Sequence, residues 1–130
     1  MGITFDLFTN VTSIDQLQLK LMMLCAPLVG VDDFTLFIRS DDETVMDVRL
    51  SVTQPLCGIV GDCVRNCARR HLQCPMKDRR WDDSIDTPAQ VYLVLPLAMQ
   101  GQTLGAMRLL RISPDAEMFQ VEDLELLEAL

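Results

Sequence analysis

Near the amino terminus, apolar residues recur at alternating steps of three and four positions, the spacing of one face of an α-helix. Ser13 precedes this run and Gln16 stands three positions later, which is capping-box spacing. Pro27 and Gly30 predict that the helix kinks or ends there. Met22 widens the apolar face, so one side is expected to serve the core and a partner helix is one candidate for the other. The recurring positions are Ile14, Leu17, Leu21, Leu24 and Leu28.

Two stretches of alternating apolar and polar residues predict a first β-hairpin. They cover residues 34–39 and 46–52, and the polar turn 40–43 joins them. Alternate residues of a strand lie on opposite faces of a sheet, so Phe37 and Arg39 share the face opposite Phe34. The pattern leaves open which of the two faces would line a pocket.

A second hairpin is predicted by two nearly continuous apolar runs, Val91–Leu97 and Leu104–Leu110, separated by a turn at Gln100 and Gly101. The first of these strands is expected to be central, with Pro96 near its end, where a missing amide does least harm. The second run is interrupted by one charge, Arg108.

Two further helices are expected. One begins at about Leu56, with apolar positions at steps of three and four, and the basic stretch after it is interpreted as a helix carrying His71 near its end. The other covers Val121–Leu130, where acidic residues in the first turn suit the helix dipole. Between them, the polar segment from Cys74 to Pro88 carries the only tryptophan and is interpreted as a binding loop or a poorly ordered stretch.

Composition narrows the possible functions. A chain of 130 residues with 49% hydrophobic and 23% charged residues can bury the core of one domain. Its net charge of −8 disfavours nucleic acid as a partner, and no apolar run is long enough to span a membrane. Five cysteines, an odd number, suit reduced thiols, so we expect a cytoplasmic protein. The segment Arg65–Arg80 is locally basic, which suits either an anion or a surface paired with carboxylates.

The carboxyl-terminal half resembles a GAF domain, the small sensory module of signalling proteins. The resemblance rests on residues 93–97 (LVLPL), the Gln-Gly turn, residues 104–109 (LGAMRL), and Phe119 followed by the acidic helix 122–127. It implies an α+β fold, with a central antiparallel sheet, the amino- and carboxyl-terminal helices on one face and a loop and helix layer on the other. The apolar alternation alone would equally suit a PAS-like sheet. We expect residues 1–130 to form a single GAF-like domain excised from a longer signalling protein.

In that family, the ligand pocket lies between a sheet face and the loop and helix layer, which corresponds here to residues 74–90. Trp81 would stack on a planar ligand or cover the core. The neighbouring arginines, Arg79 and Arg80, would bind an anion or form surface ion pairs, and the aspartates of the loop would accept hydrogen bonds from the ligand. Arg39 would contact the ligand or face solvent. The candidate ligand-binding residues are Arg79, Arg80, Trp81, Asp82, Asp83, Asp86, Cys74, Phe37 and Arg39.

The resemblance implies a regulatory, small-molecule-sensing input domain of a cytoplasmic signal-transduction or transcription-regulatory protein, without catalytic activity of its own. The expected partners are an unidentified small molecule, with anions among the candidates, and a second copy bound through the terminal helices; no nucleic acid or membrane is expected, and any cofactor is unknown. The alternative is a ligand-free dimerisation and relay module.

Two further chemical hypotheses concern the cysteines. Cys57-Gly58 is similar to a step in the GAF-fold methionine sulfoxide reductases, but the loop 80–85, where that family has its reactive cysteine, holds no thiol. Cys67, His71 and Cys74 have metal-ligand spacing but make an incomplete tetrahedral set, and Pro75 interrupts the geometry. We therefore expect neither a catalytic thiol nor a metal site.

Overall fold

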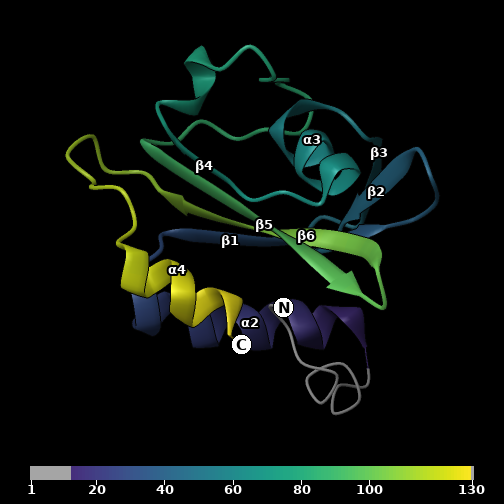
Figure 1. Ribbon diagram of the computed structural model, residues 1–130, viewed down its shortest axis with the longest axis horizontal. Helices are drawn as coiled ribbons and strands as arrows, with labels where there is room; N and C mark the ends of the chain where they lie inside the picture. The colour runs from purple at the N-terminus through teal and green to yellow at the C-terminus, as the bar shows by residue number, and fades with distance from the viewer. Residues whose placement is uncertain (1–12, 130) are drawn as a thin grey trace.

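A computed structural model describes residues 13–129 and shows one six-stranded antiparallel sheet with the strand order β3-β2-β1-β6-β5-β4 (Figure 1). Helices α2 and α4 lie on one face, and α3 and the loop after β4 lie on the other. This is the α+β architecture predicted from the sequence. The elements are α2 (Ile14–Val29), β1 (Asp33–Arg39), β2 (Thr44–Asp47), β3 (Val52–Pro55), α3 (Gly58–Asn66), β4 (Arg70–Gln73), the 3-10 turn η1 (Pro75–Lys77), β5 (Val91–Met99), β6 (Gln102–Arg111) and α4 (Val121–Glu128).

Helix α2 begins and ends as predicted. The Ser13 hydroxyl accepts a hydrogen bond from the Gln16 amide at 3.2 Å, and Gly30 ends the helix in the left-handed conformation, with φ +68°. Pro27 lies in the last turn, where its missing amide removes a single helical hydrogen bond, so the helix continues to Val29.

The predicted apolar stripe of α2 is partly wrong. The buried row advances strictly by four residues, through Leu17, Leu21, Cys25 and Val29, whereas Leu24 and Leu28 are exposed. A step of four turns the stripe gradually around the helix axis, so the buried row follows the strands beneath it and the other leucines face outward.

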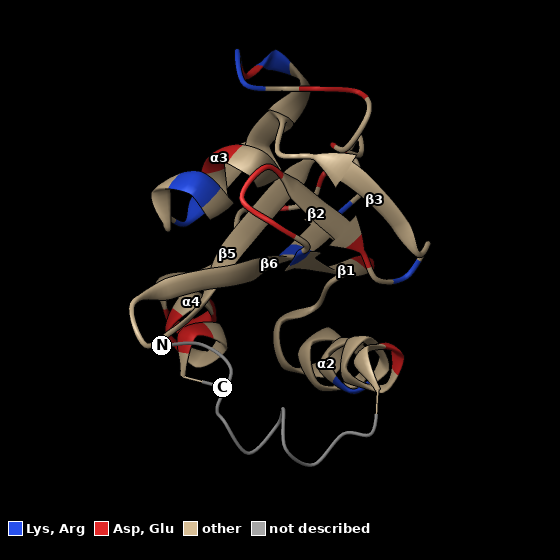
Figure 2. Cartoon of the chain, turned by 90° about the vertical axis from the view of Figure 1, so that its right-hand side faces the viewer, with Lys and Arg blue, Asp and Glu red and all other residues tan. Residues whose placement is uncertain are grey.

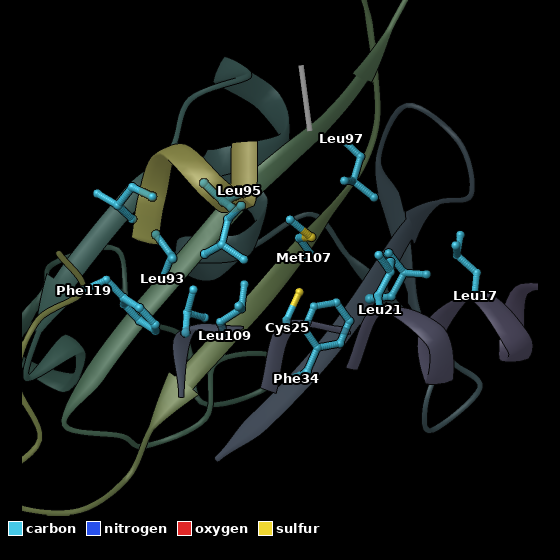
Figure 3. Packing of buried hydrophobic residues seen from close by; sticks show 14 of the residues in the cluster. Leu17, Leu21, Cys25, Phe34, Leu93, Leu95, Leu97, Met107, Leu109 and Phe119 are labelled. Atoms are coloured by element: carbon cyan, nitrogen blue, oxygen red, sulfur yellow. The ribbon is translucent and has the colours of Figure 1, made fainter. Parts of the chain in front are cut away.

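The helix-covered face of the sheet is almost entirely apolar (Figure 3). Among the described residues, the one buried polar side chain on this face is Gln18, which donates from Nε2 to the Phe34 carbonyl at 3.0 Å and accepts the Leu36 amide on Oε1 at 2.6 Å. Gln18 thereby completes the backbone hydrogen bonding of β1 at Phe34 and Leu36, which lie before the residues that pair with β2. The apolar residues of this face are Leu17, Leu21, Cys25, Val29, Phe34, Leu36, Val48, Val91, Leu93, Leu95, Leu97, Met107, Leu109, Phe119, Leu124 and Leu127.

The strand predicted over residues 46–52 is two strands. The chain turns at residues 48–51, where Ser51 takes a positive φ of +56° and the Asp47 carboxylate accepts the Leu50 amide at 3.0 Å. β3 then returns along β2 as the outermost strand. An Asp that bonds an amide three residues ahead stabilises a turn, and this local competition overrides the apparent alternation.

The hairpin of β5 and β6 is confirmed. Gln100 and Gly101 both have positive φ, +53° and +81°, in the two-residue turn between paired Met99 and Gln102. A Cβ at Gly105 would collide with the Phe37 carbonyl oxygen of β1, which gives a physical reason for the Leu-Gly step of the sequence motif.

The basic stretch after α3 is not helical, contrary to the prediction. α3 ends at Asn66, with Cys67 in the left-handed conformation, and residues 70–73 form β4, which pairs with the first half of β5. Pro96 lies beyond the last pair of that ladder, Arg70 with Val94, so its missing amide disturbs no bond to β4. Within residues 13–129, no helix is long and apolar enough to cross a bilayer.

Candidate functional site

The tryptophan-bearing loop folds inward over the sheet. Ile85, Asp86 and Ala89 are buried against the face that carries Phe37, and Trp81 is partly buried beside them. Because the opposite face is covered by α2 and α4, the loop side is the one that corresponds to the expected pocket. Phe37 therefore lies on the face that the loop and α3 cover.

Asp86 fixes this loop to two other elements. Its Oδ2 accepts the amides of Ile59 at 3.0 Å and Asp82 at 2.9 Å, and its Oδ1 accepts the Tyr92 hydroxyl at 2.7 Å. The carboxylate is only 4% exposed, so these three donors replace water. Burial raises the pKa of Tyr92 well above its usual value, which keeps its hydroxyl protonated and able to donate. Gly58 is needed beside it, since any Cβ there would collide with the Asp86 carboxylate.

Arg108 lies at the centre of the same face. It projects from β6, stands opposite Thr35 of β1 and Val94 of β5 in the sheet register, and is 2% exposed. Its guanidinium carbon lies 5.0 Å from the ring centre of Phe37 and 5.8 Å from that of Tyr92, both within cation–π range. An arginine buried to this degree is rare unless it is paired.

The hydrogen bonds of Arg108 are incomplete. Nη1 donates to the Ile85 carbonyl at 2.8 Å, and Nη2 lies 3.4 Å from the Thr35 hydroxyl, a long contact. Nε has no partner, and none of the ion pairs formed by the described residues includes Arg108. A guanidinium remains charged at all ordinary pH values, so a buried cation here has no carboxylate paired with it.

The arginines predicted to meet a ligand lie farther out. Arg80 donates from Nε and Nη2 to the two oxygens of Asp78, both at 2.8 Å, and from Nη1 to Asp62 at 3.0 Å. The hydrogen bonds from Arg80 lower the pKa of Asp78 to about 2. Arg70 also pairs with Asp62, at 2.6 Å, whereas Arg79 is exposed. Much of the locally basic segment is thus engaged in ion pairs with carboxylates.

The remaining predicted residues surround the loop without converging on one point. The Trp81 indole donates to Asp83, and Asp82 accepts the Ser84 amide and hydroxyl at 2.9 and 2.6 Å. The half-buried Cys74 lies 3.9 Å from the side-chain oxygen of Gln90. Arg39 is outside this region: it donates to the carbonyls of Asp41 and Asp42 and borders two open hollows of about 350 and 380 Å³.

Cys57 and Cys63 are not activated as nucleophiles. Burial raises the pKa of Cys63 to about 12, and it also raises the pKa of Cys57, whose sulfur lies 3.5 Å from the Ser84 hydroxyl. A reactive cysteine needs the opposite shift. His71 of β4 uses Nε2 to accept the Phe119 amide at 3.1 Å, which leaves that nitrogen engaged; no cluster of three metal-ligating residues occurs within residues 13–129.

Phe37 and Asp86, which the sequence analysis named as candidates, lie in this buried layer, whereas Arg108, Tyr92 and Thr35 were not named. The available sign was one charge in the otherwise apolar run Leu104–Leu110. A strand covered on both faces has no solvent side for such a charge, so an isolated arginine in a central strand marks a buried polar site.

Comparison with solved structures identifies the fold of this chain. The sequence matches no family model, and no curated protein matches it. Among solved structures, the GAF domain of an Acinetobacter phosphoenolpyruvate-protein phosphotransferase has a TM-score of 0.76 at 13% identity, over 94% of this chain and 79% of that one. The GAF-B domain of DevS from Mycobacterium smegmatis has a TM-score of 0.65 at 21% identity, over 82% and 78% of the two chains.

A third structure, the NreA protein of Staphylococcus aureus mutated in its nitrate binding site, has a TM-score of 0.63 at 13% identity, over 87% of this chain and 98% of that one. The chain therefore has the GAF-domain fold, as the sequence motifs predicted. At these identities the likeness concerns the fold, and function has to be argued from the residues themselves.

Proposed function

We propose that this chain is a regulatory, small-molecule-sensing GAF domain of a signal-transduction or transcription-regulatory protein. The observation that carries the proposal is the buried, unpaired Arg108 under the inward-folded loop. A buried charge without a carboxylate partner costs stability, and a binding site is the most direct reason to keep such a residue. The NreA structure, whose nitrate binding site is named, supports the idea that this fold accommodates a small ligand.

Strand β6 connects the proposed site with the terminal helices. Arg108 points to the loop side, while its chain neighbours Met107 and Leu109 belong to the apolar cluster beneath α2 and α4. A ligand that shifts Arg108 or the loop therefore acts on a strand whose other face supports both terminal helices. The size of any response is limited by the ligand's preference for one arrangement over the other.

The test is a thermal-shift screen with nucleotides, 2-oxo acids and small anions, followed by hydrogen exchange of the domain with the stabilising compound. A compound at a hundred times its Kd adds about 2.7 kcal/mol to the free energy of unfolding. We expect altered amide exchange in α2 and α4 as well as in residues 74–90. If no compound stabilises the domain, or if the terminal helices do not respond, the sensing proposal is wrong.

One observation favours the alternative of a ligand-free dimerisation and relay module. α2 exposes an apolar surface, and Asp15 and Lys20 are its only charged residues (Figure 2). A dimer formed through α2 would cover this surface. Sedimentation analysis distinguishes the two: the relay module requires a dimer in the absence of ligand, and Met23→Glu should then give monomers. The exposed residues are Leu19, Met22, Met23, Leu24 and Leu28.

A further inference from the structure

We infer that Arg108 binds a small, planar, singly charged oxyanion, such as nitrate or a short carboxylate, through the Nε and Nη2 edge of its guanidinium. This inference rests on the proposed sensing function and names its ligand class. Nε and Nη2 lie on the same edge of the planar group, and their N–H bonds form a fork that fits the two oxygens of such an anion.

The hydrogen-bond pattern selects that edge. Nη1 is taken by the Ile85 carbonyl at 2.8 Å. Nε has no hydrogen-bond partner, Nη2 lies 3.4 Å from the Thr35 hydroxyl, and Arg108 also interacts with the Tyr92 hydroxyl. Arginine carries five N–H donors and accepts nothing, so unpaired donors on one edge are satisfied by an acceptor from outside.

The carboxylate within this layer does not substitute for such an anion. Asp86 uses both oxygens on the Ile59 amide, the Asp82 amide and the Tyr92 hydroxyl. It forms no ion pair with Arg108 in the described residues. The Asp86 carboxylate holds the loop in place and reaches Arg108 only through the Tyr92 hydroxyl, which interacts with both side chains.

The surroundings limit the size and charge of the ligand. Arg108 is 2% exposed, so an anion reaches its guanidinium only by displacing close neighbours, and a compact anion displaces fewer of them than a bulky one. One buried positive charge is neutralised by one negative charge, whereas a doubly charged phosphate would bring its own unpaired charge into the interior. The aromatic rings of Phe37 and Tyr92 flank the guanidinium, which favours a flat ligand lying in the guanidinium plane.

The Ile85 carbonyl gives this site a direct connection with the loop. It is held by the same guanidinium, next to Asp86 in the chain. An anion on the neighbouring edge would compete for the orientation of Arg108, so binding changes how firmly residues 74–90 are held. This is the local event that the proposed signalling function needs.

The experiment measures binding of sodium nitrate and of sodium formate to the whole chain by calorimetry and by thermal shift, with sodium fluoride at equal ionic strength as the salt control. Fluoride is strongly hydrated and does not form the fork-shaped contact. We expect nitrate or formate, but not fluoride, to raise Tm. We expect Arg108→Met to weaken binding at least about tenfold, since two charge-assisted hydrogen bonds are lost.

Three further variants make the result specific. Arg108→Lys keeps the charge but loses the fork and should bind more weakly than the natural chain. Thr35→Val removes the hydroxyl at the same edge while keeping the side-chain shape. Arg65→Met removes one exposed positive charge outside the site, where Arg65 pairs with Glu43 at 3.2 Å, and should bind normally. Circular dichroism of each variant verifies that it is folded.

The outcomes separate this inference from the broader proposal. If nitrate or formate binds equally well to Arg108→Met, the anion site lies elsewhere and the inference is wrong, although the chain still senses a ligand. If neither anion binds the natural chain while another compound of the screen does, the ligand class is wrong and sensing survives. If Arg65→Met loses anion binding as strongly as Arg108→Met, the loss of binding comes from the lower net positive charge and not from the Arg108 site, and the inference is wrong.

Discussion

Leu109 and Arg108 are neighbours on β6, yet they face two different environments. Leu109 points into the apolar cluster beneath α2 and α4, and Arg108 points into the layer beneath the loop, where Asp86 and Tyr92 are also buried. The first face is built as an ordinary core, in which every side chain adds to stability. The second keeps a charge that has no carboxylate paired with it, and the proposed binding function gives a reason for keeping it.

The largest expected effect is on the helix face. Leu109→Ala removes a fully buried side chain and should lower the free energy of unfolding by about 3 kcal/mol, because it combines lost burial with a cavity. Urea unfolding measures this difference. A loss below about 1 kcal/mol would mean that the helices repack around the missing side chain, and that this face contributes less to stability than a well-packed core.

The next effect concerns the Asp86 carboxylate. Asp86→Ala leaves the Ile59 and Asp82 amides and the Tyr92 hydroxyl without their acceptor, and we expect a loss of about 2–3 kcal/mol together with faster hydrogen exchange in residues 74–90. Asp83→Ala is the control, since Asp83 is exposed and should change stability little. Equal effects of the two substitutions would show that the loop is not held by Asp86.

A smaller effect depends on pH. Burial, followed by the nearby Arg69 and Arg111, lowers the pKa of His71 below its usual 6.5. As the pH falls, the unfolded chain therefore binds a proton at His71 before the folded chain does. The stability that neutral His71 contributes is fully present above pH 6.5 and is lost as the pH falls through the lower pKa of the folded state. Protonation also removes the acceptor for the Phe119 amide, which precedes α4.

Because His71 is the only histidine, NMR titration of its ring and urea unfolding between about pH 5 and pH 7.5 should show the same transition. His71→Leu should remove the pH dependence in this range. A folded-state pKa at or above 6.5 would contradict the account.

The smallest effect is expected at the surface ion pairs. Arg65→Ala breaks an exposed pair with Glu43 and should change the free energy of unfolding by less than about 0.5 kcal/mol, with a further decrease at high salt. Differential scanning calorimetry at low and high salt measures this. A loss above about 1 kcal/mol would show that the basic segment contributes more to folding than its exposure suggests.

Much of the fold was predictable because it depends on local patterns. The Ser13 cap, the Gln100-Gly101 turn and the two apolar strands of the second hairpin follow from residues close in sequence. β4 and the turn at residues 48–51 were not predicted, because edge strands are short, polar and stabilised by partners far along the chain. The burial of Leu17 rather than Leu24 depends on the angle at which α2 crosses the sheet, which no local pattern contains.

The candidate site was predictable in position but not in composition. A polar loop with one tryptophan, in a chain that resembles a GAF domain, indicated residues 74–90, and the structure places that loop over the sheet. The sequence pattern predicted that Arg79 and Arg80 of the loop contact the ligand, but Arg80 forms ion pairs with Asp78 and Asp62. Arg108 lies in a strand whose other residues suggested core, and its importance appears only when the register brings Thr35 beside it.

The most direct test of this account is the stability of Arg108→Met in the absence of any added anion, measured by urea unfolding in a fluoride buffer. If Arg108 is retained for binding, the gain from removing its unpaired charge should offset the lost hydrogen bond to the Ile85 carbonyl, so that the free energy of unfolding stays within about 1 kcal/mol of the natural chain or rises. A loss of about 3 kcal/mol or more would show that the guanidinium is a structural part of the core, and would contradict the central claim.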